Sequence, residues 1–228
     1  MIRKIKVMTA IYSHIDISAG EARKLRGFFG NQNANDEKLH NHLQDGSQVY
    51  KYPVVQYKVL WGHPAVTAAE EGIISIYPLL MQNNELCIGS RSYTDTFLDI
   101  QISERLIGDS RKIQNYQFLT PWIALNQKNY RIYQKMGYEE QEAFLNKILI
   151  GNVLAFYKNF GVTIEQKLEA EHELKMIPIV YKKNKMIGFI GRFSVNCYLP
   201  DLFGIGKGVS RGFGTIKSVR EKEQMHHE

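Results

Sequence analysis

Two histidines separated by a single residue, His40 and His42, are the side chains best suited by type and spacing to chemistry. They follow an Asn-rich polar stretch and precede a turn at Asp45-Gly46, in a segment where side chains are commonly exposed to ligands. Histidine titrates near neutral pH, so one member of a pair can accept a proton while the other donates one. On residue types alone, two solvated loop histidines are the commoner explanation of such a pair.

The same pair could hold a metal ion, because imidazole is a common metal ligand. The nearest candidate for a third ligand after the pair is Asp45, whereas zinc sites use three or four protein ligands. We therefore predict neither a metal nor any other cofactor here. The other histidines lie in the tail or lack a suitable partner: His14, His63, His172, His226 and His227.

A second cluster lies near the end of the chain, where five glycines occur within the eleven residues from Gly204 to Gly214. Such a run predicts backbone at positive φ or in close approach to another group. Apolar residues alternate through it, so we expect a loop that is anchored in a core, with its glycines and basic residues facing outward. These apolar residues are Ile205, Val209 and Phe213. Free backbone N–H groups beside Lys207, Arg211 and Lys217 would suit a phosphate, although the spacing is neither that of a P-loop nor that of a dinucleotide fingerprint.

The positive charge is concentrated in the same region. Residues 1–105 hold 11 basic and 11 acidic side chains, so the net charge of +6 comes from the rest of the chain. Residues 174–220 carry nine basic side chains and one acidic side chain, including a predicted hairpin tip at Lys182-Lys-Asn-Lys185. A charge run is usually only a solvated face, but a localised basic surface beside aromatic residues favours a nucleic-acid partner.

Two blocks of sequence resemble a known family. The spacing Gly-x-Gly, five residues, Gly-Phe-Gly resembles the C-terminal glycine-rich loop of the RAMP superfamily of CRISPR-associated RNA-binding proteins. Three motifs near the other end resemble the branch of that superfamily formed by precursor-RNA-processing endoribonucleases. These motifs are Leu25-Arg-Gly-Phe-Phe-Gly-Asn, Leu39-His-Asn-His-Leu and Tyr52-Pro-Val-Val-Gln-Tyr-Lys58. The two blocks occur in the matching order, so the resemblance spans nearly the whole chain.

The resemblance implies an α+β fold with two ferredoxin-like (βαββαβ, RRM-like) domains in tandem. We expect residues 1–105 to carry the histidine pair and residues 112–228 the glycine-rich loop. It also implies a metal-independent endoribonuclease that cleaves CRISPR repeat RNA, the precursor of crRNA. In such a reaction the RNA 2′-hydroxyl attacks the adjacent phosphate and leaves 2′,3′-cyclic phosphate and 5′-hydroxyl ends. The alternatives are a non-catalytic RAMP-type subunit that holds guide RNA, and a metal-dependent nuclease.

The resemblance places a catalytic histidine in the segment of His40 and His42. Tyr50 and Lys51 begin the predicted strand that follows, and because side chains alternate along a strand, only one of them faces the site unless the strand is bulged. We assign Tyr50 to the catalytic group and Lys51 to surface contact with RNA. The opposite assignment, with Lys51 stabilising the phosphorane, stays open.

The predicted RNA contacts come from the basic stretches and the glycine-rich loop. They are Arg23, Lys24, Arg26, Lys51, Lys183, Lys185, Gly206, Lys207, Arg211, Gly212, Gly214 and Lys217. The expected partner is CRISPR repeat RNA. Association with other CRISPR effector subunits and a homodimer are both left open.

Hydrophobic periodicity predicts the elements that must position these residues. In the first half these are strands at 2–13, 49–60, 64–69, 85–89 and 97–102, a helix at 19–29 after a Ser18-x-x-Glu21 capping box, and a short helix at 73–81 disturbed by Pro78. Residues 104–112 look like a junction. The second half predicts strands at 113–125, 175–181, 186–198 and 213–219, a long helix at 139–160 that Gly161 ends, and a hairpin turn at Lys183-Asn184.

Composition sets the outer limits. With 228 residues and 44% hydrophobic content, the chain suits one large or two small globular domains. No apolar run reaches the roughly 18 residues of a membrane span, and the first residues lack an apolar signal region, so we expect a cytoplasmic protein without membrane contact. Cys87 and Cys197 lie in apolar strand-like sequence and are predicted to be buried free thiols.

Overall fold

The computed structural model describes residues 1–33, 35–40, 52–82, 84–94 and 96–219, with only the backbone of His40. These residues divide into two units. The N-terminal unit contains Lys4–Arg105 together with Gly208–Gly212, and the C-terminal unit contains Met1–Arg3, Leu106–Lys207 and the chain from Phe213 onward. The middle of the glycine run is thus counted with the N-terminal unit, although the residues on both sides of it belong to the C-terminal unit.

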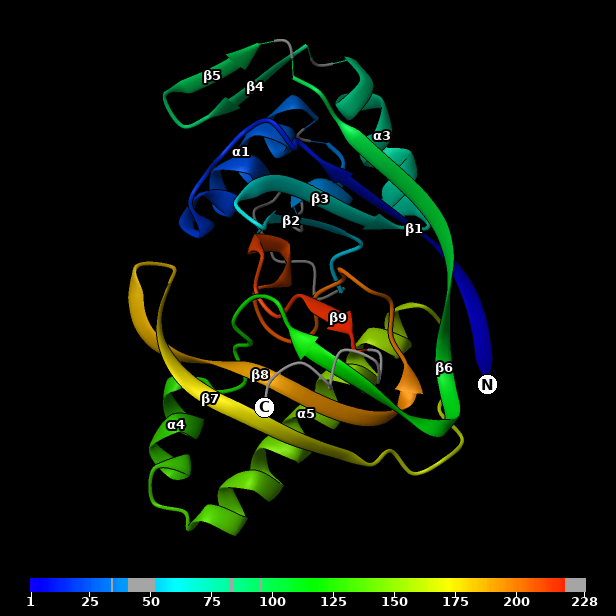
Figure 1. Ribbon diagram of the computed structural model, residues 1–228, viewed down its shortest axis with the longest axis vertical. Coiled ribbons are helices and arrows are strands. Elements are labelled where there is room, and N and C mark those ends of the chain that lie inside the picture. The colour runs from blue at the N-terminus through cyan, green and yellow to red at the C-terminus, as the bar shows by residue number, and fades with distance from the viewer. Residues whose placement is uncertain (34, 41–51, 83, 95, 220–228) are drawn as a thin grey trace, which may run out of the picture. The chain divides into compact units, whose positions relative to one another are not determined.

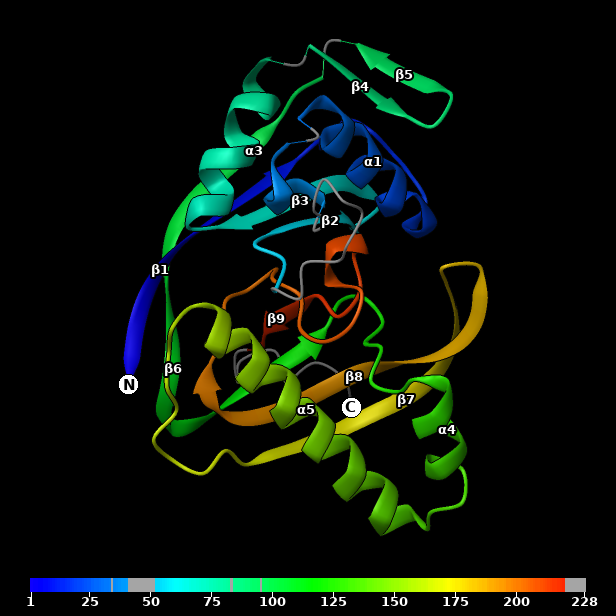
Figure 2. The same cartoon turned by 180° about the vertical axis from the view of Figure 1, so that it is seen from behind.

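The sheet of the N-terminal unit has the strand order β2-β3-β1-β6. These strands are β1 (Ile2–Ile11), β2 (Val55–Leu60), β3 (His63–Ala69) and the first part of β6 (Asp99–Phe118). Two helices, α1 (Ala22–Gln32) and α3 (Glu71–Gln82), cover one face of this sheet (Figures 1 and 2). The element order β1-α1-β2-β3-α3-β6 is the ferredoxin-like arrangement.

Local signals explain where α1 begins but not where it ends. The backbone N–H of Ser18 donates to the Glu21 carboxylate at 3.1 Å, as the capping box predicts, and a 3₁₀ turn η1 (Ala19–Glu21) precedes the helix. The predicted end near Gly30 is wrong, since α1 continues to Gln32. Gly30 is buried inside the helix beside Phe29, whose ring stacks on Tyr57 of β2 at 5.9 Å, so this glycine does not terminate the helix.

Other boundaries in this unit also differ from the prediction. Strand β2 begins at Val55 rather than near residue 49; residues 52–54 are not strand, and 49–51 lie outside the described residues. Pro53 has no N–H to give to a ladder, which favours a start after it. Helix α3 contains Pro78 and extends beyond both predicted ends. Strand β4 (Glu85–Ile88) pairs only with the unpredicted β5 (Arg91–Thr94), in a separate two-stranded sheet.

The C-terminal unit repeats the ferredoxin-like order in its sheet, β7-β8-β6-β9. Its strands are the second part of β6, β7 (Ala170–Tyr181), β8 (Asn184–Tyr198) and β9 (Ile216–Ser218). Helix α5 (Tyr138–Asn159) crosses the β7–β8 side of the unit (Figure 2) and buries Leu149, Val153 and Phe156. The glycine run, with its 3₁₀ turn η2 (Val209–Arg211), stands where the second helix of a ferredoxin-like domain would be.

The predicted strand at 113–125 extends too far, since β6 ends at Phe118, and three further differences from the prediction occur in this unit. Residues 104–112 are not a junction loop, because they lie inside the 20-residue strand β6. Helix α4 (Gln127–Tyr133) was not predicted. The two-residue hairpin turn is Lys182-Lys183 rather than Lys183-Asn184, since Tyr181 pairs with Asn184. The predictions for α5 and for Gly161, which ends it at φ 63°, are confirmed. None of the helices in the described residues is both long and apolar enough to cross a membrane.

The glycine run adopts the backbone that its composition predicts. Gly206, Gly208, Gly212 and Gly214 all have positive φ, and Ile205 and Val209 are buried. A Cβ on Gly214 would lie 2.1 Å from the carbonyl oxygen of Ile205, and one on Gly206 would lie 2.6 Å from Nε1 of Trp122. Both glycines are therefore required for packing, and the expectation that all of them face outward is wrong for these two.

Gly214→Ala should lower the free energy of unfolding by more than about 2 kcal/mol, because the new Cβ meets a backbone oxygen in a conformation that side chains disfavour. The measurement is urea denaturation followed by circular dichroism. The matched control is Gly151→Ala on α5, where a Cβ meets nothing within 4 Å, so stability should rise by about 0.5–1 kcal/mol. Equal stability of Gly214→Ala and wild type would contradict the close approach.

Candidate nucleic-acid interface

Of the histidine pair, the structure describes only the backbone of His40. Helix α2 (Glu37–His40) is held by Leu39, which is buried, and it packs against α1 and α3. The backbone of His40 therefore ends a short helix within the N-terminal unit. His42, Tyr50 and Lys51 lie outside the described residues, so their predicted roles stay predictions.

The segment Gly208–Gly212 packs on the N-terminal unit. Its turn η2 packs against α1 and β2, and a Cβ on Gly212 would lie 3.2 Å from both Cβ of Ala22 and Cα of Lys58. Arg211 is thereby brought to the first turn of α1, the helix that carries Arg23. Arg23 and Arg211, which are far apart in the sequence, thus lie on neighbouring elements.

The three cations predicted on α1 differ in their surroundings. Arg23 is exposed, whereas Lys24 Nζ lies 3.1 Å from Glu21 Oε1. Arg91 of β5 also forms an ion pair with Glu21. The hydrogen bond from Arg91 lowers the pKa of the Glu21 carboxyl most, followed by those from Ser18 and Lys24, and together they bring it to about 2. Arg26 is half-buried. The charge of Lys24 is therefore partly neutralised by Glu21, whereas the exposed Arg23 is more accessible to a polyanion.

A polar row is buried on the sheet face opposite α1. Gln56, Thr67 and Thr9 face one another across β2, β3 and β1, and all three are buried. Lys58 follows Gln56 on the same face and is completely buried, with its Nζ donating to Gln56 Oε1 at 3.0 Å. Burial lowers the pKa of Lys58 well below its ordinary value, because the charged form loses its water. Although Lys58 is part of a motif that carries the family resemblance, its burial has no signal in the sequence.

The C-terminal unit holds a basic and aromatic cluster around Tyr181. Lys207 Nζ lies 5.4 Å and Lys182 Nζ 5.9 Å from the centre of the Tyr181 ring, and the ring of Phe213 meets it edge-on at 5.6 Å. Cations over an aromatic face beside a half-exposed ring suit RNA phosphates and bases. Tyr181, Lys182 and Phe213 were not among the predicted contacts, although Lys182 belongs to the same lysine-rich turn as Lys183 and Lys185.

The turn of the β7–β8 hairpin keeps its lysines at a conformational cost. Lys182 and Lys183 have φ of 49° and 68°, the left-handed region in which hairpin turns favour Asn-Gly. A non-glycine residue there costs roughly 1–2 kcal/mol. The turn therefore places two lysines side by side at the tip in backbone conformations that side chains disfavour.

The prediction of free backbone N–H groups in the glycine run is wrong at four positions. The N–H groups of Ile205, Arg211, Gly212 and Gly214 donate to Gly214, Gly208, Val209 and Pro121 carbonyls, respectively, at 2.9–3.2 Å. The positive φ values of the glycines permit tight turns, in which these backbone N–H groups donate to backbone carbonyls of the same chain. These four N–H groups are therefore already used within the protein and are not free to bind a phosphate.

A polar cavity of about 650 Å³ offers a different set of groups. It is lined by residues of α5, β6, β7 and β8 that include Glu142, Glu171, Glu173, His172 and Arg192. Burial lowers the pKa of His172 and favours its neutral form. Three glutamates make this cavity a poor phosphate site, and no group of three or more possible metal-ligating side chains occurs here or elsewhere in the described part of the chain.

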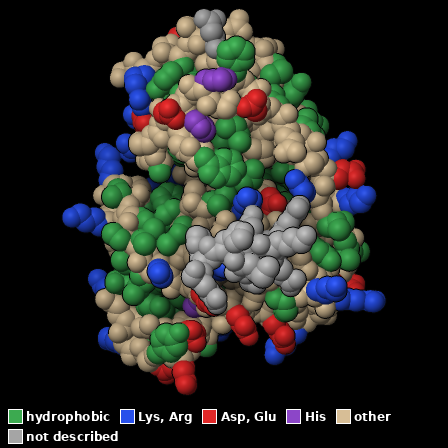
Figure 3. All heavy atoms as spheres, viewed as in Figure 1, with side chains coloured by type: hydrophobic (Ala, Val, Ile, Leu, Met, Phe, Trp, Pro, Cys, Tyr) green, Lys and Arg blue, Asp and Glu red, His purple; other side chains and the backbone are tan. Residues whose placement is uncertain are grey.

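On the face drawn in Figure 3, lysine and arginine side chains stand mainly around apolar patches and at the margins, outside the atoms drawn in grey. The visible charge does not form one continuous stripe.

Comparison with known proteins identifies the family. The family models described as Cas6b N-terminal domain and Cas6b C-terminal domain match residues 3–105 and 108–219. The chain belongs to the Cas6b family. A crystal structure of Cas6b is 36% identical, with a TM-score of 0.91, and the match covers 95% of this chain and all of that one. A second crystal structure, of a CRISPR RNA processing endoribonuclease Cas6b, is 32% identical with a TM-score of 0.78, over 95% of this chain and all of that one.

Two further proteins are similar to this chain. A Cas6-related protein from Pyrococcus furiosus is 13% identical with a TM-score of 0.57, over 96% of this chain and all of that one. An uncharacterized protein of Methanocaldococcus jannaschii is 43% identical over 115 residues, half of this chain and 78% of that protein. The predicted family and the tandem ferredoxin-like fold are confirmed.

Lys58→Met should flatten the pH dependence of stability. Because the folded-state pKa of Lys58 lies below its ordinary value of 10.5, the unfolded chain binds more protons between these two pKa values, and the free energy of unfolding rises with pH across that window. Chemical denaturation of wild type and variant at several alkaline pH values measures this slope. Lys128→Met, at an exposed position on α4, is the matched control. If Lys58→Met keeps the wild-type slope, Lys58 is not held neutral.

Proposed function

We propose that this chain is an endoribonuclease that cleaves CRISPR repeat RNA. The observation that carries the proposal is the match of both Cas6b domains along the chain, together with a relative of 32% identity described as a CRISPR RNA processing endoribonuclease. The cationic and aromatic cluster around Tyr181 and the arginines of α1 and η2 supply chemistry suited to an RNA ligand.

The proposed reaction needs no metal. One histidine of the pair His40 and His42 takes the proton from the 2′-hydroxyl, whose oxygen attacks the adjacent phosphorus. The bond from phosphorus to the 5′-oxygen then breaks, and the other histidine gives that oxygen a proton. The products carry 2′,3′-cyclic phosphate and 5′-hydroxyl ends. Tyr50 orients a histidine or the 2′-hydroxyl, and a nearby cation or donor stabilises the phosphorane.

Side chains from two parts of the chain hold the RNA backbone in this proposal. They are Arg23, Lys24, Arg26, Lys51, Lys183, Lys185, Lys207, Arg211 and Lys217. Gly206, Gly212 and Gly214 contribute by shape, since their positive φ values let the loop present Lys207 and Arg211. Salt should weaken such binding, because each phosphate contact releases counterions.

A non-catalytic RAMP-type subunit would bind the same RNA without cutting it. The family match favours cleavage, because a relative over 30% identical is described as an endoribonuclease. Mapping the ends of RNA incubated with and without the protein separates the two functions, since the proposed route leaves a cyclic phosphate at one protein-dependent position, whereas a binding subunit leaves the RNA intact.

Each of His40→Ala and His42→Ala should slow single-turnover cleavage of repeat RNA by about 10²–10⁴-fold, the range for a positioned proton-transfer group. RNA affinity should stay near that of wild type. The double variant should lose little more than the worse single variant, because groups that act as a unit are not additive. His14→Ala, an exposed histidine beside Phe97, is the control and should cleave normally.

Two further measurements test the same mechanism. A deoxynucleotide immediately upstream of the cut should abolish cleavage and leave binding intact, since the nucleophile belongs to the RNA. Cleavage should persist in excess chelator. Full cleavage of the deoxy substrate would refute the mechanism, and loss of activity in chelator would support the metal-dependent alternative.

Lys207→Ala with Arg211→Ala should weaken binding of repeat RNA and reduce the slope of log affinity against log salt by about 0.7–1 for each lost phosphate contact. Fluorescence anisotropy at several salt concentrations measures both. Lys147→Ala with Lys158→Ala removes two exposed cations from α5 and should leave the slope unchanged. An unchanged slope in the first variant would place the RNA elsewhere.

A further inference from the structure

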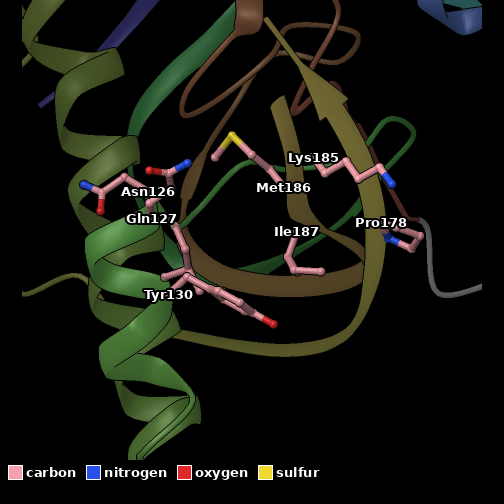
Figure 4. A pocket seen from close by; sticks show the side chains of 8 residues that line it. Asn126, Gln127, Tyr130, Pro178, Lys185, Met186 and Ile187 are labelled. Atoms are coloured by element: carbon pink, nitrogen blue, oxygen red, sulfur yellow. The ribbon is translucent and has the colours of Figure 1, made fainter. Parts of the chain in front are cut away.

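A second cavity lies between α4 and the β7–β8 hairpin of the C-terminal unit (Figure 4). Its volume is about 270 Å³, near the lower limit of the roughly 300–1,000 Å³ common for small-molecule sites. Such a volume suits one small ring system. The lining is mostly apolar, with two carboxamides and one cation: Leu125, Tyr130, Pro178, Met186 and Ile187, then Asn126, Gln127 and Lys185.

Backbone pairing fixes the walls of this cavity. Trp122 pairs with Phe189 of β8 through hydrogen bonds of 2.8 and 2.9 Å, which sets where the chain leaves the sheet before α4. Tyr133 then packs edge-on against Phe189 at 6.1 Å. Tyr130, three residues earlier, lies on the same face of the helix and so is turned toward the hairpin. The site is therefore built into the fold.

The polar groups stand at defined places around this lining. Asn126 caps α4, with its Oδ1 accepting the backbone N–H of Asn129 at 2.8 Å, and Gln127 begins the helix. In Figure 4, Tyr130 extends from α4 toward Ile187, while Lys185 lies on the hairpin side next to Pro178. Lys185 belongs to the lysine-rich end of the hairpin, where it pairs with Val180 two residues after the turn at Lys182-Lys183. The cavity thus combines an aromatic ring, amides and a neighbouring cationic tip.

We propose that this cavity receives one unpaired base of the RNA, in contact with the Tyr130 ring and with the hairpin lysines at its phosphates. The proposal rests on the proposed function. Unstacked bases are commonly bound on aromatic side chains and recognised at their edges by amides. Lysines bind phosphate without regard to sequence, so the base contact would add a position-specific preference.

The other occupant that an apolar cavity admits is a hydrophobic side chain of a partner protein. The surrounding charge favours RNA: the lining contains no acidic residue, and three lysines stand at the hairpin end beside it. Two of these lysines form the turn itself, so their charges lie together at the end of the hairpin.

The test combines abasic RNA with a protein variant. The probe is repeat RNA made uncleavable by a deoxynucleotide at the cut, with each unpaired position made abasic in turn. Wild-type protein should bind the RNA about tenfold more weakly when the base at one position is removed. For Tyr130→Ala, removal of the same base should weaken binding by less than twofold. Tyr138→Ala, an aromatic residue 75% exposed at the start of α5, is the matched control and should keep the wild-type profile.

Two more variants separate base contact from damage to α4. Tyr130→Phe keeps the ring and should retain the abasic effect, and Gln127→Ala, at an exposed position, should weaken discrimination among the four bases at that position. If Tyr130→Ala keeps the wild-type abasic profile, the cavity does not bind a base. A hydrophobic side chain of a partner protein then becomes the favoured occupant. This failure is distinct from failure of the proposed function, in which wild type itself would neither bind nor cleave repeat RNA.

Discussion

The packing around Trp122 is the constraint on which the C-terminal unit depends most. The side chain is fully buried, its backbone pairs with Phe189 of β8, and its Nε1 donates to Asn152 of α5 at 3.0 Å. Gly206 lies so close to Nε1 that no Cβ would fit. One residue thus links the sheet, the long helix and the glycine run, so displacement of any of them disturbs the others. It also sets the start of the segment that forms α4 and the smaller cavity.

This arrangement explains how a glycine-rich loop can be both irregular and precise. Its ends are tied to the C-terminal unit, because Gly214 donates to Pro121 and accepts from Ile205, while the turn η2 packs on α1 and β2 of the N-terminal unit. Two N–H groups at the ends of the loop, those of Ile205 and Gly214, donate in these contacts, and those of Arg211 and Gly212 donate within the turn itself. The loop is thus irregular in its dihedral angles but fixed at both ends and in the middle by hydrogen bonds and packing.

The sequence predicted elements well where one local signal dominates. The capping box at Ser18 and Glu21, the long apolar periodicity of α5 and the positive φ values of the glycine run are all found in the structure. The proposed histidine pair stood out through residue type and spacing, and only the backbone of His40 falls within the described residues.

Prediction failed where tertiary packing decides. Gly30 reads as a helix end but is buried in a continuing helix, and α4 is held by Tyr133 against Phe189, a contact that no short-range pattern reveals. The burial of Lys58 is equally invisible, because a strand with alternating polar residues predicts one solvated face. Tyr133 shows the cause most plainly, because its partner Phe189 is distant in the chain.

The burial of Lys58 bears on how the proposed chemistry would be divided. A lysine whose environment favours the neutral amine is a poor source of fixed positive charge for a phosphorane, whereas it can hold the amide of Gln56 through a hydrogen bond at 3.0 Å. Gln56 also donates to the Pro53 carbonyl at 3.2 Å, at the point where the chain enters β2. Through Gln56, Lys58 is thus linked to the start of β2, a role that a neutral amine can fill. A buried polar row is costly where a member lacks a hydrogen-bond partner, as the hydroxyl of Thr67 does in the described structure, so the hydrogen bond between Lys58 and Gln56 helps to offset that cost.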